Sequence, residues 1–175
     1  MELQNLEREN FRDMQFQRES GDLLGAVRDA HMNGYEHGSP VSVALEELAW
    51  GRKRSDWIWY VFPQIHLGNS PLSERFSVKT CSEIDALLED PFVGSNISLA
   101  FVQAAKLVTS GSSIDSIFGN DGKKARSSAV LFSGNLDAHN KSKNMQLYEA
   151  ASVLRDSAIQ EVGMCVATLK FLQGC

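Results

Sequence analysis

The sequence predicts an all-α protein that forms one compact multihelical domain over residues 1–175. The first observation is that apolar residues recur at helical spacing in several separate segments. The second is that strand signals are scarce, because only WIWYVF at 57–62 is strongly β-prone and a single strand has nothing to pair with. The third is a hydrophobic content of 43% in 175 residues, which suits one core and leaves little room for a second.

The clearest helix covers residues 40–50. Ser39 and Pro40 form its start signal, because serine caps helices and proline is tolerated in the first turn. Its apolar residues then fall on one face, and Gly51 is placed to end it. Other helical patterns cover 5–18, 22–32, 72–78, 83–90, 97–108, 114–118, 145–157 and 161–172, whereas 125–132 fits a helix or a strand and 133–144 a polar connector.

Residues 20–38 have the composition of an insertion into this domain. They contain Gly21, Gly25, Gly34 and Gly38 around one short helical pattern with weak periodicity. A segment of this kind is typical of an inserted or mobile connector. We therefore expect the fold to survive its replacement by a short Gly/Ser bridge.

The aromatic segment 57–62 predicts a central helix that is buried on nearly every side. Trp57, Ile58 and Phe62 are expected in the core, where large aromatic side chains bury the most surface. Pro63 would end the helix. Indole N–H and tyrosine O–H groups need polar partners when buried, so one or two of Trp59, Tyr60 and Gln64 are expected to edge a pocket.

Basic residues gather in two stretches of an otherwise acidic chain, whose net charge is -5. Residues 48–79 hold five basic against two acidic side chains, and residues 119–146 hold the same numbers. Two short basic stretches suit a small anion better than duplex DNA, where affinity grows with the number of phosphates neutralised. The alternative is that both stretches are solvated loops.

The two stretches share the pattern of basic residues followed by Arg-Ser, and this predicts an anion cradle. Arg54 and Arg126 would share one anion above a floor of Trp59 and Tyr60. The same arginines could instead cap helix-terminal carbonyls and play a purely structural role. The candidate ligand-binding residues are Arg52, Arg54, Ser55, Trp59, Tyr60, Gln64, Lys123, Arg126 and Ser127.

Candidates for catalysis are few. His66 and Glu74 are the candidate proton carriers, and the sequence leaves open whether the protein is an enzyme. The motifs HExxH, GxxxxGK[ST], GxSxG and GxGxxG are absent, and the four histidines are scattered, so no metal and no cofactor are expected. The acidic pairs Glu46-Glu47 and Glu89-Asp90 are interpreted as solvated helix faces.

Three cysteines are an odd number without CxxC spacing, which argues against a disulfide framework. Cys81 and Cys165 are expected to be buried, and Cys175 to be exposed. A reducing compartment follows, so we expect a cytoplasmic protein. No apolar run reaches membrane-spanning length and the first residues are too polar for a signal peptide, so no membrane partner is expected.

Three segments together carry a resemblance to a known family. They are GRKRSDWIWYVFPQI, GNSPLSERF and IFGNDGKKARSSAVLF. The chain resembles the domain-of-unknown-function family eighteen-ten, whose members are often labelled calpastatin without biochemical support. The likeness covers 41–135 and, more weakly, LEREN-FRDMQ and CVATLKFL. It implies a compact multihelical protein with a buried central helix, and it implies no reaction.

Two classes of function follow from these observations. The first is binding or processing of a small phosphate-bearing, nucleotide-like ligand. The second is a non-catalytic interaction domain for an acidic peptide or single-stranded nucleic acid. The sequence leaves the ligand identity, the reaction and the oligomeric state open.

Overall fold

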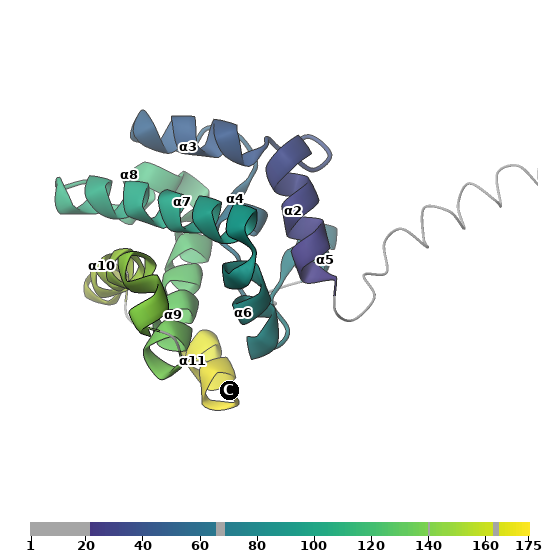
Figure 1. Cartoon of the computed structure of the whole chain (residues 1–175). Coiled ribbons are helices and arrows are strands. Elements are labelled where there is room, and N and C mark those ends of the chain that lie inside the picture. The colour runs from purple at the N-terminus through teal and green to yellow at the C-terminus, as the bar shows by residue number, and fades with distance from the viewer. Residues whose placement is uncertain (1–21, 66–68, 140, 163–164) are drawn as a thin grey trace, which may run out of the picture.

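The structure is a computed structural model that describes residues 22–65, 69–139, 141–162 and 165–175. The predicted helix at 5–18 and the candidate His66 lie outside the described residues. Figure 1 shows the arrangement of the helices. Their bounds are α2 (Leu23–Asn33), α3 (Val41–Ala49), α4 (Ile58–Val61), α5 (Pro71–Phe76), α6 (Cys81–Glu89), α7 (Pro91–Thr109), α8 (Ile114–Phe118), α9 (Gly122–His139), α10 (Met145–Val162) and α11 (Val166–Gln173), with 3₁₀ turns η1 (Gly119–Asp121) and η2 (Lys141–Asn144).

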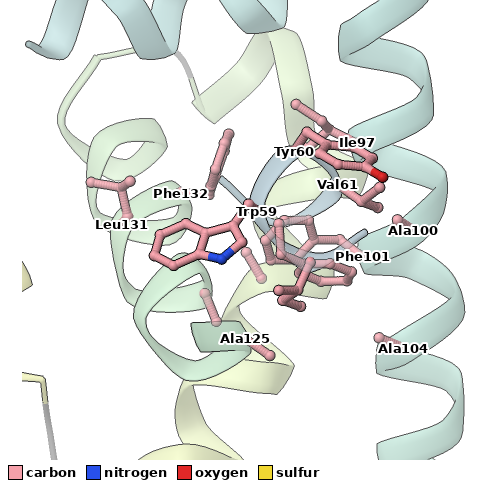
Figure 2. Close-up of a cluster of buried hydrophobic side chains, with 14 of the residues drawn as sticks. Trp59, Tyr60, Val61, Ile97, Ala100, Phe101, Ala104, Ala125, Leu131 and Phe132 are labelled. Carbon is pink, nitrogen blue, oxygen red and sulfur yellow. The ribbon is translucent and has the colours of Figure 1, made fainter. Parts of the chain in front are cut away.

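The all-α prediction is confirmed. In the described ranges, β-type pairing is limited to one parallel bridge between Ile65 and Val78. The aromatic segment forms the short helix α4, and its residues Ile58, Trp59, Tyr60 and Val61 are at most 8% exposed. Figure 2 shows Trp59, Tyr60 and Val61 between α7 on one side and α9 on the other. The predicted buried central helix is therefore present, although it is only one turn long.

Helix α7 is the longest element and passes through the middle of the molecule (Figure 1). Asp90 caps it by accepting hydrogen bonds from the N–H groups of Phe92 and Val93, and Pro91 occupies its first turn. The interpretation of Asp90 as a solvated charge is therefore wrong. The helix is long and apolar enough to cross a membrane by length and composition. Its contacts with α3, α6 and α10 account for that apolar character within this fold.

The predicted serine cap of the 40–50 helix is absent, whereas α5 and α6 carry side-chain caps. Ser70 accepts a hydrogen bond from the N–H of Ser73 at the start of α5. At α3 the N-cap is Pro40, which lacks a capping side chain, so Ser39 does not cap. At α6 the capping residue is Thr80, which forms a capping box with Glu83.

Helix α2 is part of the core, so the segment 22–38 does not form a loose connector. Leu23 and Val27 of α2 are fully buried, and α2 contacts every helix from α3 to α7. This burial argues against the expected tolerance of a 20–38 deletion, because the deletion would remove core side chains and leave a large cavity. That this segment is an insertion relative to other proteins stays a prediction.

Helix α9 resolves the ambiguity at 125–132 in favour of helix and extends beyond it to His139. The predicted polar connector at 133–144 is wrong over its first half, since Ser133, Asn135 and Leu136 are buried. Gly134 is the point where α11 approaches, because a Cβ there would lie 2.4 Å from Leu172 Cδ1. Absence of a side chain at this position permits the close contact between α9 and α11.

Cys81 and Cys175 form a disulfide that ties the start of α6 to the end of the chain. The expectation that no disulfide forms is wrong, because folding brings together two cysteines that lie 94 residues apart. Cys165 is free and half-buried, with its sulfur 3.2 Å from Ser127 Oγ. The cytoplasmic location stays a prediction.

His31 of α2 is a buried titratable group, with 1% of its surface exposed. Its Nε2–H donates to the Tyr60 carbonyl at 2.6 Å, so Nδ1 carries the lone pair. Nδ1 has no hydrogen-bond partner among the described residues. Burial lowers the pKa of His31 to about 4, against the opposing effects of the Tyr60 carbonyl and Asp90.

We expect the folded state to lose about 3 kcal/mol of stability through His31 alone between pH 7 and pH 4. The sign follows from a folded pKa of about 4 below the unfolded value of 6.5: the unfolded chain takes up the proton first, so stability falls as the pH falls. Urea unfolding of the wild type and His31→Gln at both pH values measures the difference. The control is the exposed His37→Gln, which should behave like the wild type. Equal acid sensitivity of His31→Gln and wild type would contradict this assignment.

Candidate functional site

The turn after α3 is held by one carboxylate. Glu47 accepts hydrogen bonds from the backbone N–H of Arg54 (2.6 Å) and Ser55 (3.0 Å). It also accepts bonds from Ser55 Oγ (2.7 Å) and Trp57 Nε1 (2.8 Å). Burial opposes the charge of Glu47, but these four bonds outweigh it and hold the pKa of the carboxyl below its ordinary value. The interpretation of Glu47 as a solvated charge is therefore wrong.

The two basic stretches meet at Asp121. Lys53 Nζ lies 2.7 Å from one carboxylate oxygen of Asp121, and Lys124 Nζ lies 2.6 Å from the other. Each ammonium also lies over an indole ring, Lys53 at 5.3 Å from Trp57 and Lys124 at 5.1 Å from Trp59. Burial opposes the charge of Asp121, but its hydrogen bonds from the two lysines keep its pKa below the ordinary value.

A cavity of about 220 Å³ opens beside this cluster. Trp59 and Tyr60 line it, as the sequence analysis expected of a pocket edge, and both side chains are at least nine-tenths buried. Its lining consists of Tyr35, Glu36, His37, Gly38, Asp56, Trp57, Ile58, Trp59, Tyr60, Leu72, Asp121 and Lys124. The aromatic rings form its floor, because Glu36, His37 and Asp56 are exposed and occupy the rim.

Tyr60 fixes the wall of the cavity. Its hydroxyl donates to the carbonyl oxygen of Ser39 (2.6 Å) and lies 2.9 Å from that of Asp56. Burial raises the pKa of Tyr60 to about 12, so the hydroxyl stays protonated and remains a donor. Gly38 lies against this hydroxyl, since a Cβ there would be 2.6 Å from the Tyr60 oxygen. The tyrosine therefore joins the segment before α3 to α4.

The predicted arginine pair does not line this cavity. Arg126 is buried in α9 and bonds Asp115 at 3.0 Å, whereas Arg54 is exposed. Five further predicted binding residues also lie outside the cavity lining: Arg52 and Lys123 are exposed, Ser55 bonds Glu47, Ser127 lies against Cys165, and Gln64 is fully buried. Lysines take the place expected of the arginines at the junction of the two stretches.

Gln64 and the catalytic candidates add no reactive group to the cavity. The amide of Gln64 has no hydrogen-bond partner among the described residues. Glu74 lies on α5 and does not line the cavity, and His66 is outside the described residues. In the part of the chain that is described, no group of three or more His, Cys, Asp or Glu side chains is placed to hold a metal ion.

Sequence reasoning missed Lys53, Asp121 and Glu47 as organising residues. Asp121 is the single carboxylate between two glycines at the start of the second basic stretch. An isolated acidic residue beside several basic ones could have been recognised in the sequence as an ion-pair partner. Lys53 lies between two exposed residues of the same charge, Arg52 and Arg54. Its side chain points inward because Asp121 lies there. Only the tertiary structure shows that juxtaposition.

The fold and the cavity together define a small all-helical protein with an aromatic-floored, charged-rim pocket. The chain belongs to the family described as "Protein of unknown function (DUF1810)", which matches residues 30–157. The crystal structure of the conserved hypothetical protein Rv1873 from Mycobacterium tuberculosis is similar, with 30% sequence identity and a TM-score of 0.59. The likeness covers 81% of this chain and 97% of that chain. None of the curated proteins matches the chain.

Removal of the Glu47 carboxylate should destabilise the fold by about 1–3 kcal/mol, because several partly buried donors then lose their acceptor. Urea unfolding of Glu47→Ala measures this loss. Glu46→Ala on the same helix is the matched control, since Glu46 is exposed, and it should change stability by less than about 0.5 kcal/mol. Similar losses for both variants would show that Glu47 does not hold the turn.

Proposed function

We propose that this protein binds a small phosphate-bearing, nucleotide-like ligand in the cavity beside Trp59. The observation that carries the proposal is the position of Lys124, whose ammonium lies 5.1 Å from the Trp59 ring centre and lines the same cavity. An aromatic face and a cation side by side suit a ligand that joins a flat ring to an anionic group.

The aromatic floor supports the ring of such a ligand. Trp59 and Tyr60 are held rigidly by the core, and Tyr35 lines the same cavity. Stacking of a base on an aromatic side chain contributes about 1–3 kcal/mol and tolerates different bases. Rigid rings lose little conformational entropy when a ligand binds, so this floor is suited to binding.

Lys124 supports the anionic group because it can leave Asp121 at low cost. Its side chain is 35% exposed, whereas that of Lys53 is only 8% exposed. If a phosphate drew Lys124 away, Asp121 would keep its bond to the buried Lys53. The carboxylate would therefore not be left unpaired, which is the costly outcome for a partly buried charge.

The charges at the rim and the volume of the cavity limit the ligand to about the size of a mononucleotide. The carboxylates of Glu36 and Asp56 line the cavity and can accept hydrogen bonds from sugar hydroxyls. Together with Asp121 they oppose a highly charged polyphosphate. A volume of about 220 Å³ lies below the range of about 300–1,000 Å³ usual for ligand pockets, so part of the ligand would remain outside.

The proposal concerns binding and assigns no reaction.

A thermal-shift comparison of AMP, GMP, CMP and UMP with their nucleosides and triphosphates tests this function. A monophosphate at 100 times its Kd should add about 2.7 kcal/mol of stability, which corresponds to roughly 5–10 °C in a domain of this size. Nucleosides should give smaller shifts, because they lack the group that Lys124 binds.

Lys124→Gln should weaken monophosphate binding about tenfold, the effect of losing about 1.4 kcal/mol. Lys123→Gln is the matched control, because Lys123 is the exposed neighbour on the same helix and does not line the cavity. Isothermal titration of both variants gives the affinities. Absence of any shift, or equal effects of the two substitutions, would refute the proposed site.

A further inference from the structure

An exposed tryptophan and two exposed arginines follow one another on the surface after α3. Trp50 is 79% exposed, the highest value among the large hydrophobic side chains of the described residues. Arg52 and Arg54 are exposed too, and neither forms an ion pair with a described carboxylate. None of the three lines the cavity beside Trp59, so the proposed function does not account for them.

The backbone that presents these side chains is fixed. Gly51 turns the chain with a φ of 92°, a conformation that favours glycine. The N–H of Arg52 donates to the Glu47 carbonyl (3.1 Å), and the N–H of Lys53 donates to the Ile117 carbonyl (2.8 Å). The tryptophan and arginines therefore start from a rigid platform, which lowers the entropic cost of binding.

The two arginines flank a buried lysine. Lys53 points inward, where its ammonium reaches Asp121 and its side chain is 8% exposed. Arg52 and Arg54, on either side of Lys53, are both exposed to solvent. The ion pair that buries Lys53 therefore lies between two arginines that remain exposed in the same turn.

This combination has the chemistry of a protein-binding hot spot. Tryptophan and arginine are the residues that most often dominate interface energies. A guanidinium group binds a carboxylate through two parallel hydrogen bonds. Arg52 and Arg54 pair with no carboxylate of the described residues, so both guanidinium groups are available to an acidic partner.

Single-stranded nucleic acid fits this surface less well. Two phosphate contacts correspond to a salt slope of only about −1.4 for a single strand, so the electrostatic term is small. The net charge of -5 opposes a long polyanion more strongly than a short segment with only a few carboxylates. A short peptide needs only two or three carboxylates and one apolar side chain for Trp50.

We infer that Trp50, Arg52 and Arg54 form a docking site for an acidic peptide segment of a partner protein. The apolar side chain of the peptide covers the indole of Trp50. Its carboxylates pair with the two guanidinium groups. This site is separate from the nucleotide-like ligand site and does not depend on it.

Selection from a random library of twelve-residue peptides displayed on phage tests the inference without presuming a partner. The selected peptides are synthesised with a fluorescent label, and their affinity for the full chain is measured by anisotropy. Trp50→Ala and the double variant R52Q/R54Q are compared with Leu99→Ala, a control on α7 whose side chain is 51% exposed. Melting temperatures establish that each variant is folded.

We expect the selected peptides to be enriched in Asp and Glu around one large apolar residue. Trp50→Ala and R52Q/R54Q should each weaken binding at least tenfold, and Leu99→Ala should leave it unchanged. Selection of no peptides, selection of neutral peptides, or binding that is unchanged in both variants would overturn the inference. Tighter binding of a twenty-nucleotide oligo(dT) through these residues would also overturn it and would indicate a nucleic-acid surface instead.

Discussion

The candidate site depends on the two ion pairs that Asp121 forms with Lys53 and Lys124. Lys53 and Lys124 come from basic stretches far apart in the chain, and without a shared anion their ammonium groups would repel each other. The carboxylate supplies that anion from within the protein. It thereby holds η1 and the start of α9 against the turn that follows α3. The cavity is lined by Asp121 and Lys124, and Arg52 and Arg54 flank the lysine that this junction buries.

The aromatic helix α4 gives this junction a rigid support. Trp57 and Phe62 pack against other rings of the core, with Phe62 4.7 Å from Phe101 between ring centres. Trp57 and Trp59 also offer their faces to Lys53 and Lys124. The same stretch therefore builds the core with one set of contacts and holds the cations with another. This double use explains why the aromatic segment lies next to charged residues in the sequence.

The fold class could be predicted from the sequence because helical periodicity and a dense aromatic segment are local signals. The central helix follows from the apolar character of residues 57–62 on all sides. Trp59 and Tyr60 could be placed at a pocket because their polar atoms need partners. The family resemblance agreed with the same reading, and residues 30–157 match that family.

Other features could not be predicted because they depend on contacts between distant segments. Arg54 and Lys53 are neighbours with the same charge, and only the position of Asp121 decides which of them turns inward. Glu47 has the local pattern of a surface residue until the chain folds back and offers it four donors. The disulfide between Cys81 and Cys175 is of the same kind, since spacing alone gives no pairing.

The most direct test of this account is a pair of double-mutant cycles on the free energy of unfolding. One cycle combines Asp121→Asn with Lys53→Met, and the other combines Asp121→Asn with Lys124→Met, at one ionic strength. The account predicts a coupling of about 1.5–3 kcal/mol for the buried Lys53 and at most about 1 kcal/mol for the more exposed Lys124. An equal or larger coupling for Lys124 would contradict it, because Lys124 would then be a fixed structural partner of Asp121 and not a group available to a ligand.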